Sequence, residues 1–373
     1  MTAAADLRPR PRRTTVGEVL ARWAKEGPLI HQATCFDALN QQTGGGPVYG
    51  SRWYVMGAPD ASKTLLLLQL AHMWSELGIT VGMHAVDEED GDLVTRLIQR
   101  TEIPSGSGAH FQRSHCEVRE PRMLALMQSA CEGSGLVFYD DSCTIEEACS
   151  DRAALAGDRK QKAVMMTDSI QTVECAWIRK SKSSDVSMRE KITQNVRAVR
   201  ACATAYKMLV MASSEMNRAA YRTIGKADQN DMAAAKESGA VEYSARVMLA
   251  LRNVTDEPNC IEARIIKNKH GPSFPMADPF YLQIDRHKQW LFDRDPPEGL
   301  GALVEAVIQC VRRHPAGVST EVARVEVGKG KGAVLAALQS AEAAKAIRRL
   351  NGDRSPWVPF EFDPGPDPDL DFP

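Results

Sequence analysis

"VMGAPDASKT", residues 55–64, nearly spells the phosphate-binding loop that reads Gly, four free residues, Gly, Lys and then Ser or Thr. Gly57, Lys63 and Thr64 fit this pattern, and Ser62 stands at the second glycine. In such a loop, backbone N–H groups and a helix N-terminus surround a phosphate, while the lysine neutralises charge and the hydroxyl reaches Mg²⁺. The predicted nucleotide-binding residues are Gly57, Ala58, Pro59, Asp60, Ala61, Ser62, Lys63 and Thr64.

The sequence on either side of the loop supports this interpretation. An apolar strand, "RWYVMG" (52–57), is expected to enter the loop, and "TLLLLQLAHMWSELG" (64–78) is expected to leave it as a buried helix that ends at Gly78. The alternative is an ordinary strand–turn–helix that contains Lys-Thr. Ser62 makes either a strained or a looser loop the expectation, because glycine tolerates backbone angles that serine resists.

Acidic residues at the ends of two other apolar runs are candidates for the metal and for the attacking water. "AVMMTDS" (163–169) contains Asp168, which is expected to complete a Mg²⁺ shell with Thr64. "TVGMHAV" (80–86) is followed by Asp87 and Glu88, either of which could orient or activate water. For Glu89 and Asp90, a solvated acidic loop is the preferred interpretation.

Apolar strands alternate with helical segments through most of the chain. The further strands expected are "LVFYDD" (136–141), "MLVMASS" (208–214), "VMLALRN" (247–253) and "EARIIKNK" (262–269). This alternation predicts an α/β fold with a mostly parallel sheet that is covered on both faces.

The character of the sequence changes at three positions, which divides the chain into four segments. We expect a disordered basic arm over 1–14, a P-loop ATPase domain with an N-terminal helix over 15–297, a small domain over 298–360, and a disordered acidic tail over 361–373. The small domain is predicted to contain three helices and then a hairpin turning at Asn351-Gly352, which is the order of a winged helix.

Composition excludes several classes of protein. The chain of 373 residues has a net charge of -2, so a nucleic-acid binder must concentrate its basic residues locally. No apolar run is long enough to cross a bilayer, and no segment has the form of a signal peptide. Nine cysteines occur without a CxxC pair and are expected to be reduced. The expected protein is soluble and cytoplasmic.

The order of these segments resembles one family over about residues 30–293. "KESGAVEYSARVMLALRN" (236–253) and "IIKNKHGP" (265–272), in that order, resemble the motor domain of hexameric replicative helicases of the DnaB type and of their plasmid RepA relatives. The resemblance implies a RecA-like P-loop fold, ATP and Mg²⁺ as ligands, and assembly into a homo-oligomeric, hexameric ring.

The resemblance also implies roles for individual residues. The catalytic Glu of the family falls at Asp87, or at Glu88 with a shift of one residue, and Glu215 stands where the family has a Gln sensor. Lys267 and Lys269 stand where the family uses a Lys and an Arg that reach the ATP of the neighbouring subunit. The family pattern is broken at Ser62, Asp87, Glu215 and Lys269, so ATP binding is expected and efficient hydrolysis is in question.

Two basic segments are candidates for contact with single-stranded DNA. One carries Arg179, Lys180 and Lys182, and the other carries Arg218, Arg222 and Lys226 beside an aromatic residue suited to base stacking. Solvated basic loops are the alternative for both. The 298–360 domain is expected to bind either DNA or protein. The acidic tail is expected either to bind a replication protein or to act only as a solubilising, disordered tail.

The predicted function is an ATP-dependent helicase or translocase acting on single-stranded DNA. Because little sequence precedes the motor, replication of a plasmid, phage or mobile element is the expected setting. The alternative is a weakly hydrolysing, ATP-binding regulator or loader, and a recombinase-like branch of the same fold is a third reading.

Overall fold

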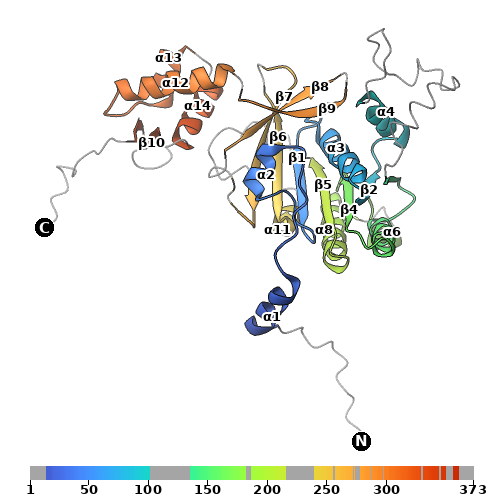
Figure 1. Ribbon diagram of the computed structural model, residues 1–373. Helices are drawn as coiled ribbons and strands as arrows, with labels where there is room; N and C mark the ends of the chain where they lie inside the picture. Colours follow the sequence, from blue (N-terminus) through green and yellow to red (C-terminus); the bar gives the residue numbers. More distant parts are fainter. Residues whose placement is uncertain are drawn as a thin grey trace, which may run out of the picture.

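The computed structural model describes residues 14–100, 135–181, 186–215, 239–254, 257–271, 273, 278–286, 288–296, 298–328, 331–343, 346–349 and 356–360. Its centre is a nine-stranded sheet in the order β3-β2-β4-β5-β1-β6-β7-β8-β9 (Figure 1). The strands are β1 Arg52–Gly57, β2 Thr80–Ala85, β3 Leu136–Tyr139, β4 Ala163–Asp168, β5 Leu209–Glu215, β6 Val247–Asn253, β7 Cys260–Asn268, β8 Phe280–Asp285 and β9 Trp290–Arg294.

The sheet is parallel from β3 to β6 and antiparallel from β6 to β9. The predicted α/β fold with a mostly parallel sheet is therefore confirmed. β1 lies between β5 and β6, and its six residues are all buried. Because parallel strands end at a common edge, the segments that follow β1, β2, β4 and β5 lie along one side of the molecule.

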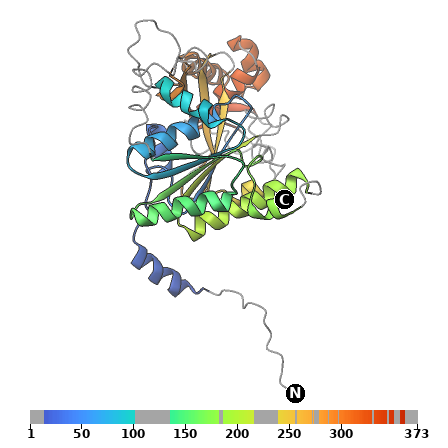
Figure 2. The same ribbon diagram turned by 90° about the vertical axis from the view of Figure 1, so that its right-hand side faces the viewer.

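Helices cover both faces of the sheet (Figure 2). On one face lie α2 Asp37–Thr43, α3 Lys63–Glu76 and α4 Asp90–Arg100, and on the other lie α6 Ile145–Asp158, α7 Ala176–Lys180, α8 Met188–Ala205 and α11 Gly239–Ser244. Successive side chains of a strand point to opposite faces. Trp53 and Val55 accordingly join the first core, whereas Tyr54 and Met56 join the second.

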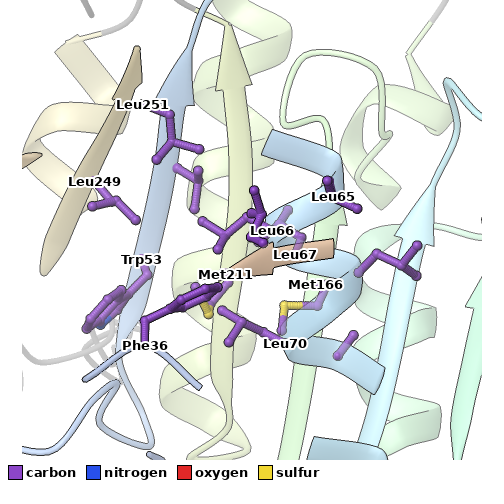
Figure 3. Close-up of a cluster of buried hydrophobic side chains, with 14 of the residues drawn as sticks. Phe36, Trp53, Leu65, Leu66, Leu67, Leu70, Met166, Met211, Leu249 and Leu251 are labelled. Carbon is purple, nitrogen blue, oxygen red and sulfur yellow. The ribbon is translucent and has the colours of Figure 1, made fainter. Parts of the chain in front are cut away.

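The helix α3, which follows the loop, is the most deeply enclosed element of the first face. Leu65, Leu66, Leu67 and Leu70 are buried in the core between α3 and the strands β1, β2, β4 and β5, and Figure 3 shows them beside Met166 and Met211. Gln69 also ties the helix to β9 through hydrogen bonds with the backbone N–H and C=O of Leu291, both 2.8 Å long. Enclosure from both sides explains the nearly uniform apolar sequence and anchors the helix whose N-terminus faces the loop.

The N-terminal helix α1, Val16–Glu26, is amphipathic, and none of its residues is buried. Its start is stabilised by a capping box between Thr15 and Glu18. Val16, Leu20 and Trp23 are exposed by 77%, 55% and 60%. The predicted helix is thus confirmed, and in Figure 1 it lies well apart from the sheet and its flanking helices.

The C-terminal segment has a hydrophobic core of its own. It contains α12 Glu298–Arg313, α13 Thr320–Val327 and α14 Lys331–Ala343, followed by the antiparallel pair β10 Ile347–Arg349 and β11 Trp357–Pro359. Val307, Val311 and Leu338 pack with Trp357 at the centre of this core. The expected order of three helices and a hairpin is observed, and its assignment as a winged helix stays a prediction.

Some expectations concern residues outside the described ranges, among them the basic arm up to residue 13, the Asn351-Gly352 turn and the tail from residue 361. Among the helices that the structure describes, none combines the length and the hydropathy that a bilayer crossing requires. Seven cysteines within the described ranges carry free thiols.

Candidate nucleotide-binding site

The loop from Gly57 to Lys63 joins the end of β1 to the start of α3, as its sequence predicts. Glycine is required at position 57, because a Cβ atom there would lie 2.9 Å from both the Ala61 Cβ and the Leu251 carbonyl oxygen. Asp60 and Ser62 have φ values of 63° and 60°, in the left-handed region. The loop therefore takes a tight, curved path between the central strand and the buried helix.

Ser62 adopts the backbone conformation for which glycine is favoured. Its φ of 60° and ψ of 28° place it in the left-handed helical region, where an L-residue costs roughly 1–2 kcal/mol. It is the N-cap residue of α3, and its side chain makes no capping hydrogen bond. The cap residue therefore offers no side-chain acceptor to the first-turn N–H groups of α3. These groups can donate hydrogen bonds to an anion such as a phosphate.

Lys63 is folded back over the loop. Its Nζ atom donates hydrogen bonds to the carbonyl oxygens of Gly57, at 3.2 Å, and Ala58, at 2.6 Å. Burial lowers the pKa of Lys63, and the negative charges of Glu215, Asp168 and Asp60 act in the opposite direction. The ammonium group thus lies among carboxylates at the mouth of the loop, where it can bind phosphate oxygens.

Asp168 and Thr64 offer oxygen ligands of the kind that Mg²⁺ prefers. Asp168 ends β4, is 6% exposed, and accepts a hydrogen bond from the Ser213 hydroxyl on β5. Thr64 lies half-buried in the first turn of α3. A carboxylate and a hydroxyl beside a lysine and a helix N-terminus are a fitting donor set for a magnesium nucleotide.

The structure gives Asp87 and Glu88 different surroundings. Asp87 accepts hydrogen bonds from the Thr172 hydroxyl at 3.0 Å and the Ser169 hydroxyl at 3.4 Å. Burial raises the pKa of Asp87, the Thr172 hydrogen bond lowers it, and the charges of Asp168 and Glu215 raise it. Asp87 therefore belongs to the same electrostatic cluster as the candidate metal ligand.

Glu88 forms an ion pair with Arg96, separate from the contacts of Asp87. Its carboxylate oxygens lie 2.8 Å and 3.1 Å from the guanidinium nitrogens of Arg96 in α4. Burial raises the pKa of Glu88, while the Arg96 charge lowers it. Since its carboxylate is occupied by a cation from its own chain, Glu88 is less suited than Asp87 to hold a water molecule.

A hollow of about 540 Å³ opens beside Asp87 at the ends of β2 and β3. Carboxylates dominate its wall, including Glu88, Glu89, Asp140 and Asp141. An acidic wall repels phosphate groups. No residue of the loop 57–64 lines this hollow, so it is not a better candidate than the loop for binding phosphate groups.

Glu215 lies at a different end of the sheet from Lys267, which is in β7, and from Lys269, which directly follows β7. Glu215 pairs with Gly57 in the β1–β5 register, which sets it beside the loop. Lys267 pairs with Met248 near the start of β6, and the Lys269 backbone N–H donates to the Arg246 carbonyl oxygen. Across the sheet, Gly57 is level with Leu251 of β6 and with Ala263 of β7. Lys267 lies four residues beyond Ala263, so the two are separated by about 13 Å along β7.

The two lysines therefore do not meet Lys63 of their own chain. The Lys267 ammonium donates a hydrogen bond to the Glu242 carbonyl oxygen, and burial lowers its pKa. Lys269 is exposed. A role for either lysine in ATP chemistry requires the site of another subunit.

The candidate DNA contacts are described only in part. The Arg179 guanidinium donates to the carbonyl oxygens of Asp141, Ser142 and Cys143, so it supports the turn after β3. Lys180 is exposed at the end of α7. Lys182, Arg218, Arg222 and Lys226 lie outside the described residues.

Sequence reasoning missed the side chains that hold the carboxylates. These are Thr172, Ser169, Ser213 and Arg96. The short distance of Thr172 and Ser169 from Asp168 in the sequence was the one available signal, because residues just after a strand at this edge tend to face a ligand site. Ser213 and Arg96 carry no comparable signal.

Comparison with known proteins agrees with this geometry. A family model, the DnaB-like helicase C terminal domain, matches residues 32–288. No protein of curated function matches the chain. A DnaB-like replicative helicase, solved in a study of its interactions with primase, superposes with a TM-score of 0.59 at 17% identity, over 76% of this chain and 68% of that one.

A second solved structure, an ATPase domain, superposes with a TM-score of 0.59 at 18% identity, over 76% of this chain and 100% of that one. At such identities the two structures support the fold alone. The family match covers more than half of the residues, and it includes the loop 57–64, the candidate carboxylates Asp87 and Asp168, and the lysines at 267 and 269. The chain therefore belongs to the family of the DnaB-like helicase C-terminal domain, a RecA-like P-loop ATPase.

Proposed function

We propose that the chain is an ATP-driven motor that moves on single-stranded DNA. One observation carries this proposal: Lys63, Asp168 and Asp87 gather at one edge of the sheet beside a glycine-requiring loop. The loop and the α3 N-terminus would bind the phosphates of ATP, and Thr64 and Asp168 would hold Mg²⁺. Bound Mg²⁺ would neutralise charge on the phosphate oxygens.

Asp87 is the proposed general base of the reaction. Its carboxylate is oriented by Thr172 and carries a raised pKa, which improves its ability to accept a proton from the attacking water. Glu88 is engaged by Arg96 and is assigned a structural role. We expect Asp87→Asn to abolish steady-state turnover while ATP still binds, and the matched variant Glu88→Gln to retain most of the turnover.

Assembly into a ring is proposed from two features. Lys267 and Lys269 lie far from Lys63 of the same chain, so a catalytic role for them needs a neighbour. The exposed apolar face of α1, with Leu20 and Trp23, supplies surface that association would bury. The same proposal includes a hexameric stoichiometry, an intracellular location, and a role in a plasmid, phage or mobile element. It also includes contacts with DNA, made by Lys180, Lys182, Arg218, Arg222 and Lys226.

Complementation between two inactive variants tests the shared site. Lys63→Ala removes the phosphate lysine, and Lys269→Ala removes the lysine offered to a neighbour. In an equal mixture, about a quarter of the interfaces would combine an intact Lys63 with a neighbouring intact Lys269. Activity should reappear on mixing, and its absence would contradict a site shared in this way.

The second candidate is an ATP-binding regulator or loader that hydrolyses slowly. The left-handed Ser62 and the acidic Glu215 beside the loop favour it, because one strains the loop and the other opposes anionic phosphate. The two proposals differ in turnover. The motor predicts ATP hydrolysis that single-stranded DNA stimulates and that Lys63→Ala abolishes. ATP binding without DNA-stimulated turnover would reject the motor and leave the regulator.

A further inference from the structure

Three side chains with metal-ligating atoms converge in the C-terminal segment, far in sequence from the nucleotide site. They are Cys310 near the end of α12, His314 directly after α12, and Glu326 in α13. Their ligand atoms all lie within 4.8 Å of one another. From this geometry we propose that Cys310, His314 and Glu326 bind a zinc ion that joins α12 to α13.

The glutamate is the common partner of the other two side chains. One carboxylate oxygen, Oε2 of Glu326, lies 2.7 Å from the Cys310 Sγ and 3.1 Å from the His314 Nε2. Its second oxygen, Oε1, lies 3.9 Å from the Arg313 guanidinium. Oε2 therefore faces the thiol and the imidazole, whereas Oε1 is the oxygen nearer to Arg313.

The backbone places these atoms together through local structure. Cys310 and His314 are four residues apart, so they lie on one face of a helical turn. The His314 N–H donates to the Val311 carbonyl oxygen, and the Gly317 N–H donates to the His314 carbonyl oxygen at 2.8 Å. Gly317 has a φ of 107° and reverses the chain, which brings α13 back alongside α12.

The turn after His314 has little freedom to rearrange. A Cβ atom at position 317 would lie 2.8 Å from the Cβ of Pro356, so the turn requires glycine and packs against the strand segment of β11. The Ser319 side chain then caps α13. Cys310 is fully buried in the core of this segment. The fold thus holds Cys310 and His314 in place before a metal ion binds.

The ligand chemistry selects zinc among the common divalent cations. A thiolate, an imidazole and a carboxylate together suit Zn²⁺, whereas Mg²⁺ and Ca²⁺ prefer oxygen ligands alone. Zinc bonds of about 2.0–2.3 Å put neighbouring tetrahedral ligands about 3.2–3.6 Å apart. The Cys310–Glu326 contact would need to open by less than about 1 Å, which the partly exposed Glu326 side chain permits.

Binding balances in charge and protons. The Cys310 thiol releases its proton to solvent as the zinc–sulfur bond forms, His314 binds as neutral imidazole, and a water molecule fills the fourth position. The resulting cross-link would stabilise the C-terminal segment without touching the ATPase site. The competing explanation is a hydrogen-bonded thiol, carboxylate and imidazole with no metal affinity.

Cobalt(II) titration of the untagged, nucleotide-free full chain distinguishes these explanations. Cobalt replaces zinc at tetrahedral sites and gives a thiolate-to-metal charge-transfer band when a cysteine binds it. We expect one such site per chain, displaced by added zinc. Cys310→Ser should remove the band, and His314→Asn and Glu326→Gln should each weaken cobalt binding by at least about 100-fold.

Cys35→Ser is the matched control, since Cys35 is exposed and lies in the ATPase domain; its titration should equal that of the wild type. If Cys310→Ser does not fold, the His314 and Glu326 variants, whose side chains are partly exposed, provide the same test. A wild-type chain that shows no charge-transfer band in excess cobalt would overturn the proposal. So would a band that persists unchanged in the Cys310 variant or in both of the others.

Discussion

Replacing Ser62 by glycine tests whether the loop is strained as the structure indicates. Ser62 has a φ of 60°, where an L-residue costs roughly 1–2 kcal/mol. Glycine removes that cost but loses about 0.4–1 kcal/mol through the greater freedom of the unfolded chain. The difference leaves Ser62→Gly more stable by about 0.5–1 kcal/mol, which corresponds to a Tm rise of about 1–4 °C for a domain of this size.

Ser62→Gly restores the second glycine of the phosphate-binding motif, yet it should change the affinity for ATP only slightly. Ser62 already takes the required conformation, so the strain is relieved equally in the free and the nucleotide-bound protein. The dissociation constant for ATP should therefore change by less than about fivefold, or about 1 kcal/mol. The assays are thermal unfolding without nucleotide and equilibrium titration with a fluorescent ATP analogue.

Lys160→Gly is the matched control, because Lys160 has a φ of 56° in an exposed turn after α6, outside the nucleotide site. It should gain comparable stability with no change in ATP affinity. A Ser62→Gly chain that melts below the wild type while Lys160→Gly gains would refute the strain argument. An ATP affinity raised more than about tenfold would show that the free loop does not hold the described conformation.

Two further variants test the contacts around the site and the sheet. Thr172→Val removes the hydroxyl that orients Asp87 and lowers its pKa. ATP turnover should fall about tenfold because the base loses its orientation, and the acid limb of the pH–rate profile should move to higher pH, while ATP affinity stays unchanged; an unchanged pH–rate profile would contradict the assigned role. Burial disfavours the charge of Glu262, yet its two arginine neighbours outweigh this and hold its pKa below the usual range of a glutamate, so Glu262→Gln should lower the free energy of unfolding by about 3 kcal/mol at pH 7. Because the folded-state pKa is depressed, that difference should shrink as the pH falls below the usual range of a glutamate, as measured by denaturant unfolding, with the more exposed Glu257→Gln as control.

Local features of the site could be predicted from the sequence. The spacing of Gly57, Lys63 and Thr64 is meaningful within one strand–loop–helix unit, and the structure has that unit where the motif indicates it. The alternation of strands and helices likewise predicted the parallel part of the sheet, because each strand's burial pattern is set by nearby residues. A strained or a looser loop at Ser62 could be anticipated from the chemistry of a single residue, and the left-handed φ of Ser62 corresponds to the strained one.

The choice between Asp87 and Glu88 could not be made in the same way. They are adjacent in the sequence, and the sequence pattern admitted either as the base. The structure separates them because Thr172, 85 residues away, reaches Asp87, whereas Arg96 reaches Glu88. These contacts depend on the order of strands in the sheet, which brings the end of β4 beside the end of β2.

The sequence by itself determined the strand–loop–helix unit that carries Gly57, Lys63 and Thr64 and the class of the fold, since both follow from residue types at short, regular spacings. Only the tertiary structure decided that Lys267 and Lys269 lie at the far end of the sheet from Lys63, and that Glu326 meets Cys310 and His314. Strand register and helix packing set these distances. Both result from burying apolar side chains throughout the core, so no short stretch of sequence contains them.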